Sequence, residues 1–252
     1  MSQKKIRLDE LLLKYSYVEN KQKATSSILS GSVLVNGVKK TKVGELVPET
    51  AKIEILEKIS KFVGRGAYKL QSAIDFFNPI IKNKICLDLG ASTGGFTEIL
   101  LLNDAKKVYA FDVGYGQMSS RLQNDNRVII KDRFNVRELN WLDIQEDLNE
   151  LFIVMDLSFI SLLKIFPVIK KLKLEKKNVL IECISLIKPQ FEVEQNQLVK
   201  GIVKNPLYHF IILKKILRYL KKDIQAEILG LCNSAIKGNS GNKEFFVYWK
   251  LK

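Results

Sequence analysis

The stretch Ile85-Cys-Leu-Asp-Leu-Gly-Ala-Ser-Thr-Gly-Gly-Phe-Thr97 decides the fold of most of this 252-residue chain. An apolar run passes through Asp88 into a glycine-rich loop, and residues 96–102 continue as a helix candidate. Glycines let the backbone approach a ligand without Cβ clashes. The spacing Gly90-x-x-x-Gly94-Gly95 matches neither the dinucleotide fingerprint nor a Walker loop. The stretch predicts a strand, a ligand-binding loop and a helix, or alternatively a glycine-rich turn without a ligand.

Strand and helix candidates alternate around this stretch. Strands are predicted over residues 85–89, 108–111, 128–130, 151–155 and 179–184, and helices over 67–77, 96–102, 161–171 and 206–222. Residues 224–231 and 244–250 predict a closing strand pair. The alternation favours an α/β fold with a mostly parallel sheet that binds ligands at the carboxyl ends of its strands.

Acidic residues near the glycine loop indicate the kind of ligand. Asp112 ends the strand that follows Asp88, 24 residues later. A carboxylate at that position can accept both hydroxyls of a ribose. A cofactor with ribose and adenine but no phosphate suits such acidic surroundings. We therefore expect S-adenosylmethionine, which carries a sulfonium and an ammonium group.

Four further polar residues lie close to predicted strand ends. Asp156 follows one apolar run, Lys188 follows the next, and Glu244 begins the last strand. Lys69 lies on the helix before the first sheet strand. Because strand ends in this fold converge on one edge, we expect Lys69, Asp156, Lys188 and Glu244 to form one cluster. Singly, each would be read as a surface or salt-bridge residue.

Charge and cysteine content exclude several classes. The chain has 41 Lys and Arg against 27 Asp and Glu, a net charge of +14, and one histidine, His209. A single histidine cannot build a multi-histidine metal site, so no metal is expected. Three widely spaced cysteines fit a reducing compartment. No signal peptide or membrane span is visible, so we expect a cytoplasmic protein without a membrane partner, whose partner is polyanionic.

The first 42 residues are especially basic, with nine Lys and Arg against three Asp and Glu. Helices are expected around Leu8–Tyr15 and over 21–29, then a strand at 33–35, a hairpin turn at Asn36-Gly37, and strands through Val43 and over 52–56.

This pattern resembles the alpha-L RNA-binding motif. The residues that carry the resemblance are Arg7-Leu-Asp-Glu-Leu-Leu, Lys21-x-Lys-Ala24 and Ile28-x-x-Gly31-x-Val-Leu-Val-Asn-Gly37. The resemblance implies RNA contacts by basic residues, for which we select Lys4, Lys5, Arg7, Lys21, Lys23 and, further on, Arg65. The alternative is a lysine-rich solvated face on an ordinary small domain.

The chain as a whole resembles the haemolysin-A (TlyA-type) family of rRNA 2′-O-methyltransferases. Its motifs are Arg65-Gly-Ala-Tyr-Lys-Leu70, Asp88–Thr97, Phe111-Asp-Val-Gly-Tyr-Gly-Gln117, Asp156-Leu-Ser-Phe-Ile-Ser161, Leu186-Ile-Lys-Pro-Gln-Phe-Glu192 and Ile236-Lys-Gly-x-x-Gly-Asn-x-Glu-Phe245. The resemblance implies a Rossmann-like class I methyltransferase sheet, mostly parallel with one antiparallel strand, behind a small N-terminal α+β RNA-binding domain. We expect these domains over 1–57 and 65–252, joined by a linker over 58–64.

The resemblance also implies roles for individual residues. Lys188 would take a proton from a ribose 2′-OH, Lys69 would assist as a nearby cation, and Asp156 and Glu244 would orient the two lysines. The cofactor would be held by Asp88, Gly90, Ala91, Ser92, Gly94, Gly95, Phe96, Asp112 and Asp132. The substrate would be cytidine in ribosomal RNA or ribosomal subunits, and the oligomeric state stays open.

The sequence departs from the family pattern at two places. Asp132-Arg-Phe-Asn135 stands where Glu-Arg-Thr-Asn is common, and Ala67 replaces a common glycine. Two other functions stay open: an RNA-binding or ribosome-assembly factor with a degenerate catalytic domain, and a pore-forming haemolysin.

Overall fold

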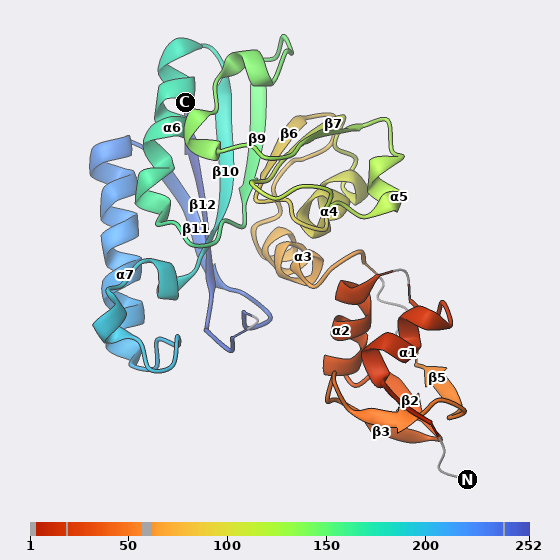
Figure 1. Cartoon of the computed structure of the whole chain (residues 1–252). Coiled ribbons are helices and arrows are strands. Elements are labelled where there is room, and N and C mark those ends of the chain that lie inside the picture. Colours follow the sequence, from red (N-terminus) through yellow and green to blue (C-terminus); the bar gives the residue numbers. More distant parts are fainter. Residues whose placement is uncertain (1–3, 19, 57–61, 239) are drawn as a thin grey trace. The chain divides into compact units, whose positions relative to one another are not determined.

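A computed structural model describes residues 4–18, 20–56, 62–238 and 240–252. The chain divides into two compact units, unit 1 over residues 1–61 and unit 2 over 62–252 (Figure 1). Most of the expected linker, residues 58–61, lies outside the described residues. Phe62 is buried in the core of unit 2.

Unit 1 consists of two short helices and two small antiparallel sheets. Its elements are β1 (Lys5–Arg7), α1 (Leu8–Lys14), α2 (Lys21–Leu29), β2 (Val33–Val35), β3 (Val38–Lys40), β4 (Leu46–Pro48) and β5 (Ile53–Ile55). The β2–β3 hairpin turns at Asn36 and Gly37, which both have positive φ, as a two-residue type I′ turn requires. The Asn20 side chain caps α2 by accepting a hydrogen bond from the Lys23 backbone N–H.

Three details of unit 1 differ from the sequence prediction. Strands β1 and β4 were not expected; they pair with each other although they lie far apart in the chain, a contact that local periodicity does not reveal. Val43 lies in a turn rather than in a strand. Tyr15 follows α1 and is exposed, so the apolar buried residues of α1 are Leu8, Leu11 and Leu12.

Unit 2 is an α/β domain around a central sheet, as predicted. Among its described residues, seven strands have the order β11-β12-β10-β9-β6-β7-β8, and only β12 runs antiparallel to its neighbours. The strands are β6 (Ile85–Leu89), β7 (Lys107–Phe111), β8 (Val128–Lys131), β9 (Glu150–Met155), β10 (Leu180–Ile187), β11 (Glu227–Asn233) and β12 (Phe245–Leu251). The predicted mostly parallel sheet with one antiparallel strand is therefore confirmed.

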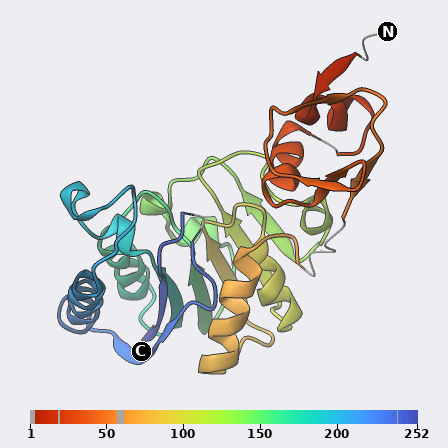
Figure 2. The same cartoon turned by 90° about the horizontal axis from the view of Figure 1, so that it is seen from below.

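Helices cover both faces of this sheet (Figures 1 and 2). They are α3 (Gly66–Phe77), α4 (Gly95–Leu102), α5 (Ser120–Gln123), α6 (Phe166–Glu175) and α7 (Pro206–Tyr219). Apolar residues of α3 and α4 share one buried cluster with one face of the sheet, and residues of α6 and α7 share a second cluster with the other. Among the described residues, no helix is both long and apolar enough to cross a membrane.

Two predicted helices of unit 2 have different boundaries. The helix expected over 161–171 is a short 3-10 turn, η3 (Leu162–Lys164), followed by α6. Pro167 lies in the first turn of α6, where its missing N–H leaves no intrahelical bond unmade. The helix expected over 206–222 ends at Tyr219 and continues as a π turn, Leu220–Ile224.

Candidate active site

Four charged side chains form two largely buried ion pairs at the carboxyl edge of the sheet. Asp156 directly follows β9, Lys188 directly follows β10, and Glu244 directly precedes the antiparallel β12. Lys188 Nζ lies 2.7 Å from Asp156 Oδ1, and Lys69 Nζ lies 2.7 Å from Glu244 Oε2. Lys69 and Lys188 are each only 9% exposed, and Glu244 is 2% exposed. Buried charges persist in proteins when they are paired, and here each lysine has a carboxylate as its partner.

Helix α3 carries Lys69 into this cluster because α3 lies unusually close to α4. A Cβ atom on Gly95 would lie 2.8 Å from the backbone nitrogen of Ala67, so only glycine allows this approach. A Cβ on Gly66 would lie 3.7 Å from Asp156 Oδ2, so the start of α3 borders the Lys188–Asp156 pair as well. The two ion pairs therefore flank the first turn of α3.

The predicted glycine loop joins β6 to α4 beside this cluster. The backbone N–H groups of Gly90 and Ala91 both donate to the carbonyl oxygen of Phe111 at the end of β7. Gly90 has a φ of +94°, and a Cβ there would lie 2.7 Å from the carbonyl oxygen of Asp156. Gly94, with a φ of +93°, precedes α4. The loop after β6 is thus packed directly on the chain that carries Asp156.

Asp88, at the end of β6, is fully buried and only half satisfied. Its Oδ2 accepts a hydrogen bond from Thr97 Oγ1 at 2.7 Å. Among the described residues, its Oδ1 has no hydrogen-bond partner. Burial raises the pKa of Asp88 to about 7, and the negative charge of Asp156 contributes. A buried carboxylate oxygen without a partner suits a ligand that brings a hydrogen-bond donor or a cation.

The other predicted cofactor residues fall into two groups. Asp112 accepts hydrogen bonds from the backbone N–H groups of Ser92, at 2.8 Å, and Gly114, at 2.7 Å. Asp132 accepts one from the Gly116 N–H at 2.7 Å. These carboxylates brace the loops after β6 and β7, and each oxygen keeps a lone pair for a ligand. Phe96 is instead part of the core, where its ring lies 6.2 Å from that of Phe246.

Sequence reasoning missed three residues around Lys188. Ser158 Oγ lies 2.7 Å from Lys188 Nζ. The Phe159 ring is 91% exposed and lies 5.1 Å from the ring of Phe191, which Lys188 Nζ approaches at 5.9 Å. Ser158 and Phe159 could have been suspected from their place just after the strand-end Asp156.

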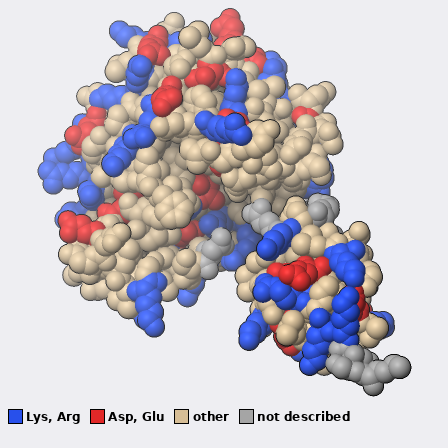
Figure 3. Space-filling model, viewed as in Figure 1, with Lys and Arg blue, Asp and Glu red and all other residues tan. Residues whose placement is uncertain are grey.

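The predicted RNA-binding residues do not share one environment. Within unit 1, Lys4 pairs with Glu49 at 3.3 Å and Arg7 pairs with Asp9 at 3.0 Å. Lys5, Lys21 and Lys23 are exposed and form no ion pair with another described residue. Figure 3 shows basic side chains spread over the visible face of unit 1 around a smaller acidic group.

Arg65 belongs to unit 2, where it precedes α3 and donates to the carbonyl oxygen of Lys237 at 3.5 Å.

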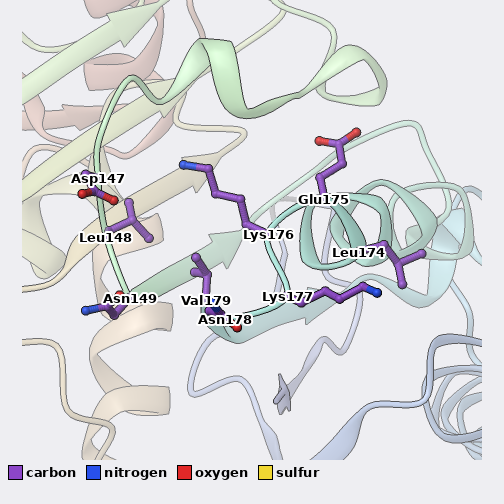
Figure 4. A pocket seen from close by; sticks show the side chains of 9 residues that line it. All are labelled: Asp147, Leu148, Asn149, Leu174, Glu175, Lys176, Lys177, Asn178 and Val179. Atoms are coloured by element: carbon purple, nitrogen blue, oxygen red, sulfur yellow. The ribbon is translucent and has the colours of Figure 1, made fainter.

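A hollow of about 470 Å³ lies at the opposite edge of the sheet (Figure 4). It is lined by residues 147–149, which lead into β9, and by residues 174–179, which join α6 to β10. It therefore lies at the amino ends of parallel strands, away from the ion pairs. No group of His, Cys, Asp and Glu able to hold a metal occurs in the described parts of the chain.

The strand order, the single antiparallel strand and the glycine loop beside strand-end carboxylates define the class I methyltransferase fold. The chain belongs to the FtsJ-like methyltransferase family, whose family model matches residues 62–251. This membership confirms that the chain is a methyltransferase of the predicted FtsJ-like type.

Relatives with established names match nearly the whole chain. "Hemolysin A" of Brachyspira hyodysenteriae is 41% identical over 97% of this chain and 99% of its own length. "16S/23S rRNA (cytidine-2′-O)-methyltransferase TlyA" of Mycobacterium tuberculosis (strain ATCC 25618 / H37Rv) is 33% identical over 97% of this chain and 90% of its own. A solved structure of a candidate hemolysin from Streptococcus thermophilus superposes with a TM-score of 0.72 and 33% identity, over 99% of this chain and 89% of that one. The predicted haemolysin-A (TlyA-type) resemblance is therefore confirmed.

Proposed function

We propose that this protein transfers a methyl group from S-adenosylmethionine to the ribose 2′-OH of a cytidine in ribosomal RNA, in the cytoplasm. The observation that carries the proposal is the pair of buried lysine–carboxylate contacts, Lys188–Asp156 and Lys69–Glu244, beside the glycine loop. The name of the Mycobacterium tuberculosis relative, which matches over nearly the whole chain, supplies the substrate class and the nucleotide. Residues 1–57 are proposed as the RNA-binding domain and 65–252 as the methyltransferase domain.

The carboxyl edge of β6 and β7 fits S-adenosylmethionine. The unpartnered Oδ1 of Asp88 suits the cationic amino acid end of the cofactor, and Asp112 retains acceptor capacity for ribose hydroxyls. Asp132, which ends the neighbouring strand region, is the candidate partner of the adenine amino group. When bound there, the cofactor would supply an electrophilic methyl group attached to a sulfonium, which is a good leaving group as a neutral sulfide.

Lys188 is the proposed base. The ion-paired ammonium of Lys188 first releases a proton to solvent, and the resulting amine Nζ then removes the proton of the 2′-OH while the oxygen forms its bond to the methyl carbon. Asp156 and Ser158 contact the same Nζ at 2.7 Å each, so they fix its position and receive the hydrogen bonds of the ammonium that forms. Lys69, oriented by Glu244, places a positive charge where negative charge develops on the attacking oxygen.

The RNA is held by two features on separate units. In unit 1, Lys5, Lys21 and Lys23 offer exposed positive charge to phosphates. In unit 2, Phe159 and Phe191 provide an aromatic surface beside Lys188 that suits stacking of an unpaired base. A nucleotide whose base is displaced from its helix exposes its ribose to Lys188.

The test is methyl transfer from labelled S-adenosylmethionine to ribosomal subunits and to naked rRNA, with mapping of the modified nucleotide. We expect transfer by the wild type and a loss of at least about 100-fold in Lys188→Ala. Lys204→Ala, which removes an exposed lysine, is the matched control and should stay active. Equal transfer by Lys188→Ala and wild type would refute the base. RNA binding without cofactor binding would instead favour a non-catalytic ribosome-assembly factor.

A further inference from the structure

Glu192 is a partly buried carboxylate that the proposed reaction does not use. It follows the short 3-10 helix η4 (Pro189–Phe191), four residues after Lys188. Its Oε2 accepts a hydrogen bond from Ser161 Oγ at 2.6 Å, and its Oε1 accepts one from the Leu162 N–H at 2.8 Å. Burial raises the pKa of Glu192, although both hydrogen bonds and the nearby Lys215 favour the charged form. Burial of a carboxylate is unfavourable, and here its hydrogen bonds to Ser161 and Leu162 offset that free energy.

These contacts close a loop that contains the surroundings of the proposed base. The 156–162 loop begins with Asp156 and Ser158 on Lys188 Nζ and ends with Ser161 and Leu162 on Glu192. Both partners of the loop belong to the segment 188–192. The loop is therefore attached at each end to the chain that follows β10.

The apex of the 156–162 loop is strained. Phe159 has a φ of +62°, in the left-handed region that bulky residues rarely adopt. Such a conformation persists only where the surrounding contacts over-determine it. Within the described residues, the side-chain contacts that hold the loop to segment 188–192 are those to Lys188, the Phe159–Phe191 ring contact and the two hydrogen bonds to Glu192. Without Glu192, the end of the loop after Phe159 loses the two polar contacts that attach it to this segment.

We propose that Glu192 is a positioning residue, which fixes the 156–162 loop so that Asp156 and Ser158 meet Lys188. The inference rests on the proposed function for its consequence, since the loop matters to catalysis only if Lys188 acts as the base. The anchoring of the 156–162 loop by Glu192 can be measured without any enzymatic activity. Misplacement of a catalytic group by about 1 Å costs on the order of 100-fold in rate.

The variants are chosen to separate the contacts of Glu192 from its charge. Glu192→Ala removes both hydrogen bonds. Glu192→Gln keeps an acceptor for the Leu162 N–H and gives Ser161 Oγ an amide donor, while the charge is lost. Glu194 is an exposed carboxylate two residues further along the chain that caps the short 3-10 helix η5 (Gln195–Gln197), outside the 156–162 loop, and Glu194→Ala is the matched control.

The first measurement is kcat for methyl transfer at saturating cofactor and rRNA, together with the Kd for S-adenosylmethionine. We expect Glu192→Ala to lower kcat roughly 10- to 100-fold with a Kd within about twofold of wild type. Glu192→Gln should recover most of the rate, and Glu194→Ala should equal wild type.

The second measurement is hydrogen exchange of the peptide that contains the 156–162 loop, which needs no activity. Exchange should be faster in Glu192→Ala and close to wild type in Glu192→Gln. Unchanged kcat and exchange in Glu192→Ala would overturn the proposal, as would a Gln variant as impaired as the Ala variant. Absence of methyl transfer by the wild type, with the exchange difference present, would refute the proposed function and retain the loop anchor.

Discussion

Replacing Asp88 by Asn should stabilise the ligand-free protein, and should do so more at high pH. Burial raises the pKa of Asp88 from its ordinary 3.8 to about 7. Well below about pH 4 the carboxyl is protonated in both the folded and the unfolded chain. The folded state is then not destabilised by a buried negative charge at Asp88. As the pH rises through about 7, the buried carboxyl of Asp88 ionises. Above this pH the folded state is destabilised by the full cost of the buried charge. A pKa rise of about 3, at 1.36 kcal/mol per pKa unit, corresponds to roughly 4 kcal/mol at pH 8.

The pH dependence separates the removal of the buried charge from the other consequences of the Asp88→Asn substitution. At pH 5 the penalty in the wild type is only roughly 1–2 kcal/mol. Burying the Asn amide costs the same at both pH values, and groups elsewhere titrate alike in both proteins. The stabilisation by Asp88→Asn, measured by denaturant unfolding, should therefore be roughly 2–3 kcal/mol larger at pH 8 than at pH 5. The Asn side chain can still accept the hydrogen bond from Thr97.

Asp112→Asn is the control that should behave in the opposite way. Each oxygen of Asp112 accepts a hydrogen bond from a backbone N–H group. In Asn, one of these oxygens is replaced by an NH2 group, which cannot accept that hydrogen bond. We expect a loss of about 1–3 kcal/mol for this variant. An equal gain for Asp88→Asn at the two pH values would refute the reasoning, because it would mean that Asp88 is not buried in its charged form. The Asp88→Asn variant should also bind S-adenosylmethionine more weakly, since it lacks the carboxylate.

Three further predictions concern packing, RNA affinity and base stacking. Gly95→Val should lower the free energy of unfolding by about 1–3 kcal/mol, because a Cβ there would lie 2.8 Å from the Ala67 nitrogen; chemical denaturation measures this. Lys21→Ala with Lys23→Ala should weaken rRNA binding and reduce the slope of log K against log salt by about 1–2, measured by titrations at several salt concentrations; an unchanged slope would remove both from the interface. Phe159→Ala should weaken productive rRNA binding by about 1–3 kcal/mol while cofactor affinity stays the same, and Phe159→Tyr should restore it, as steady-state kinetics and calorimetry would report.

The framework of unit 2 could be predicted from the sequence because its strands are buried on both faces. Runs such as Ile85–Leu89 are largely apolar and are followed by a glycine or a carboxylate. Both the strand and the point where it ends can therefore be recognised in the sequence. The predicted ends of these strands put Asp156, Lys188 and Glu244 at the same edge of the sheet. The strand pair β1–β4 was invisible, since three-residue strands carry too little pattern and their partners lie far apart in the chain.

The surroundings of Lys188 could not be predicted in the same way. Ser158 and Glu192 reach their partners only because the 156–162 loop folds back on segment 188–192, and no periodicity encodes that path. Phe159 is 91% exposed and has a positive φ, although Leu157 and Ile160 on either side of it pack against a buried apolar cluster, and the sequence pattern does not distinguish these positions.

Lysine–carboxylate pairs occur at both edges of the sheet, but the two edges differ in one respect that bears on function. At the amino edge, the buried Lys84 is paired with both Glu150 at 2.9 Å and Glu182 at 2.8 Å, so its charge is compensated within the protein. At the carboxyl edge, Asp88 keeps an oxygen without a partner among the described residues, and Phe159 is strained. Both edges belong to the same strands and the same core, so packing alone does not require the difference. Local violations of folding rules concentrate where a ligand completes the structure. These features support the proposed binding of a cationic cofactor and an unpaired base at the carboxyl edge, and they predict that the protein is less stable without these ligands.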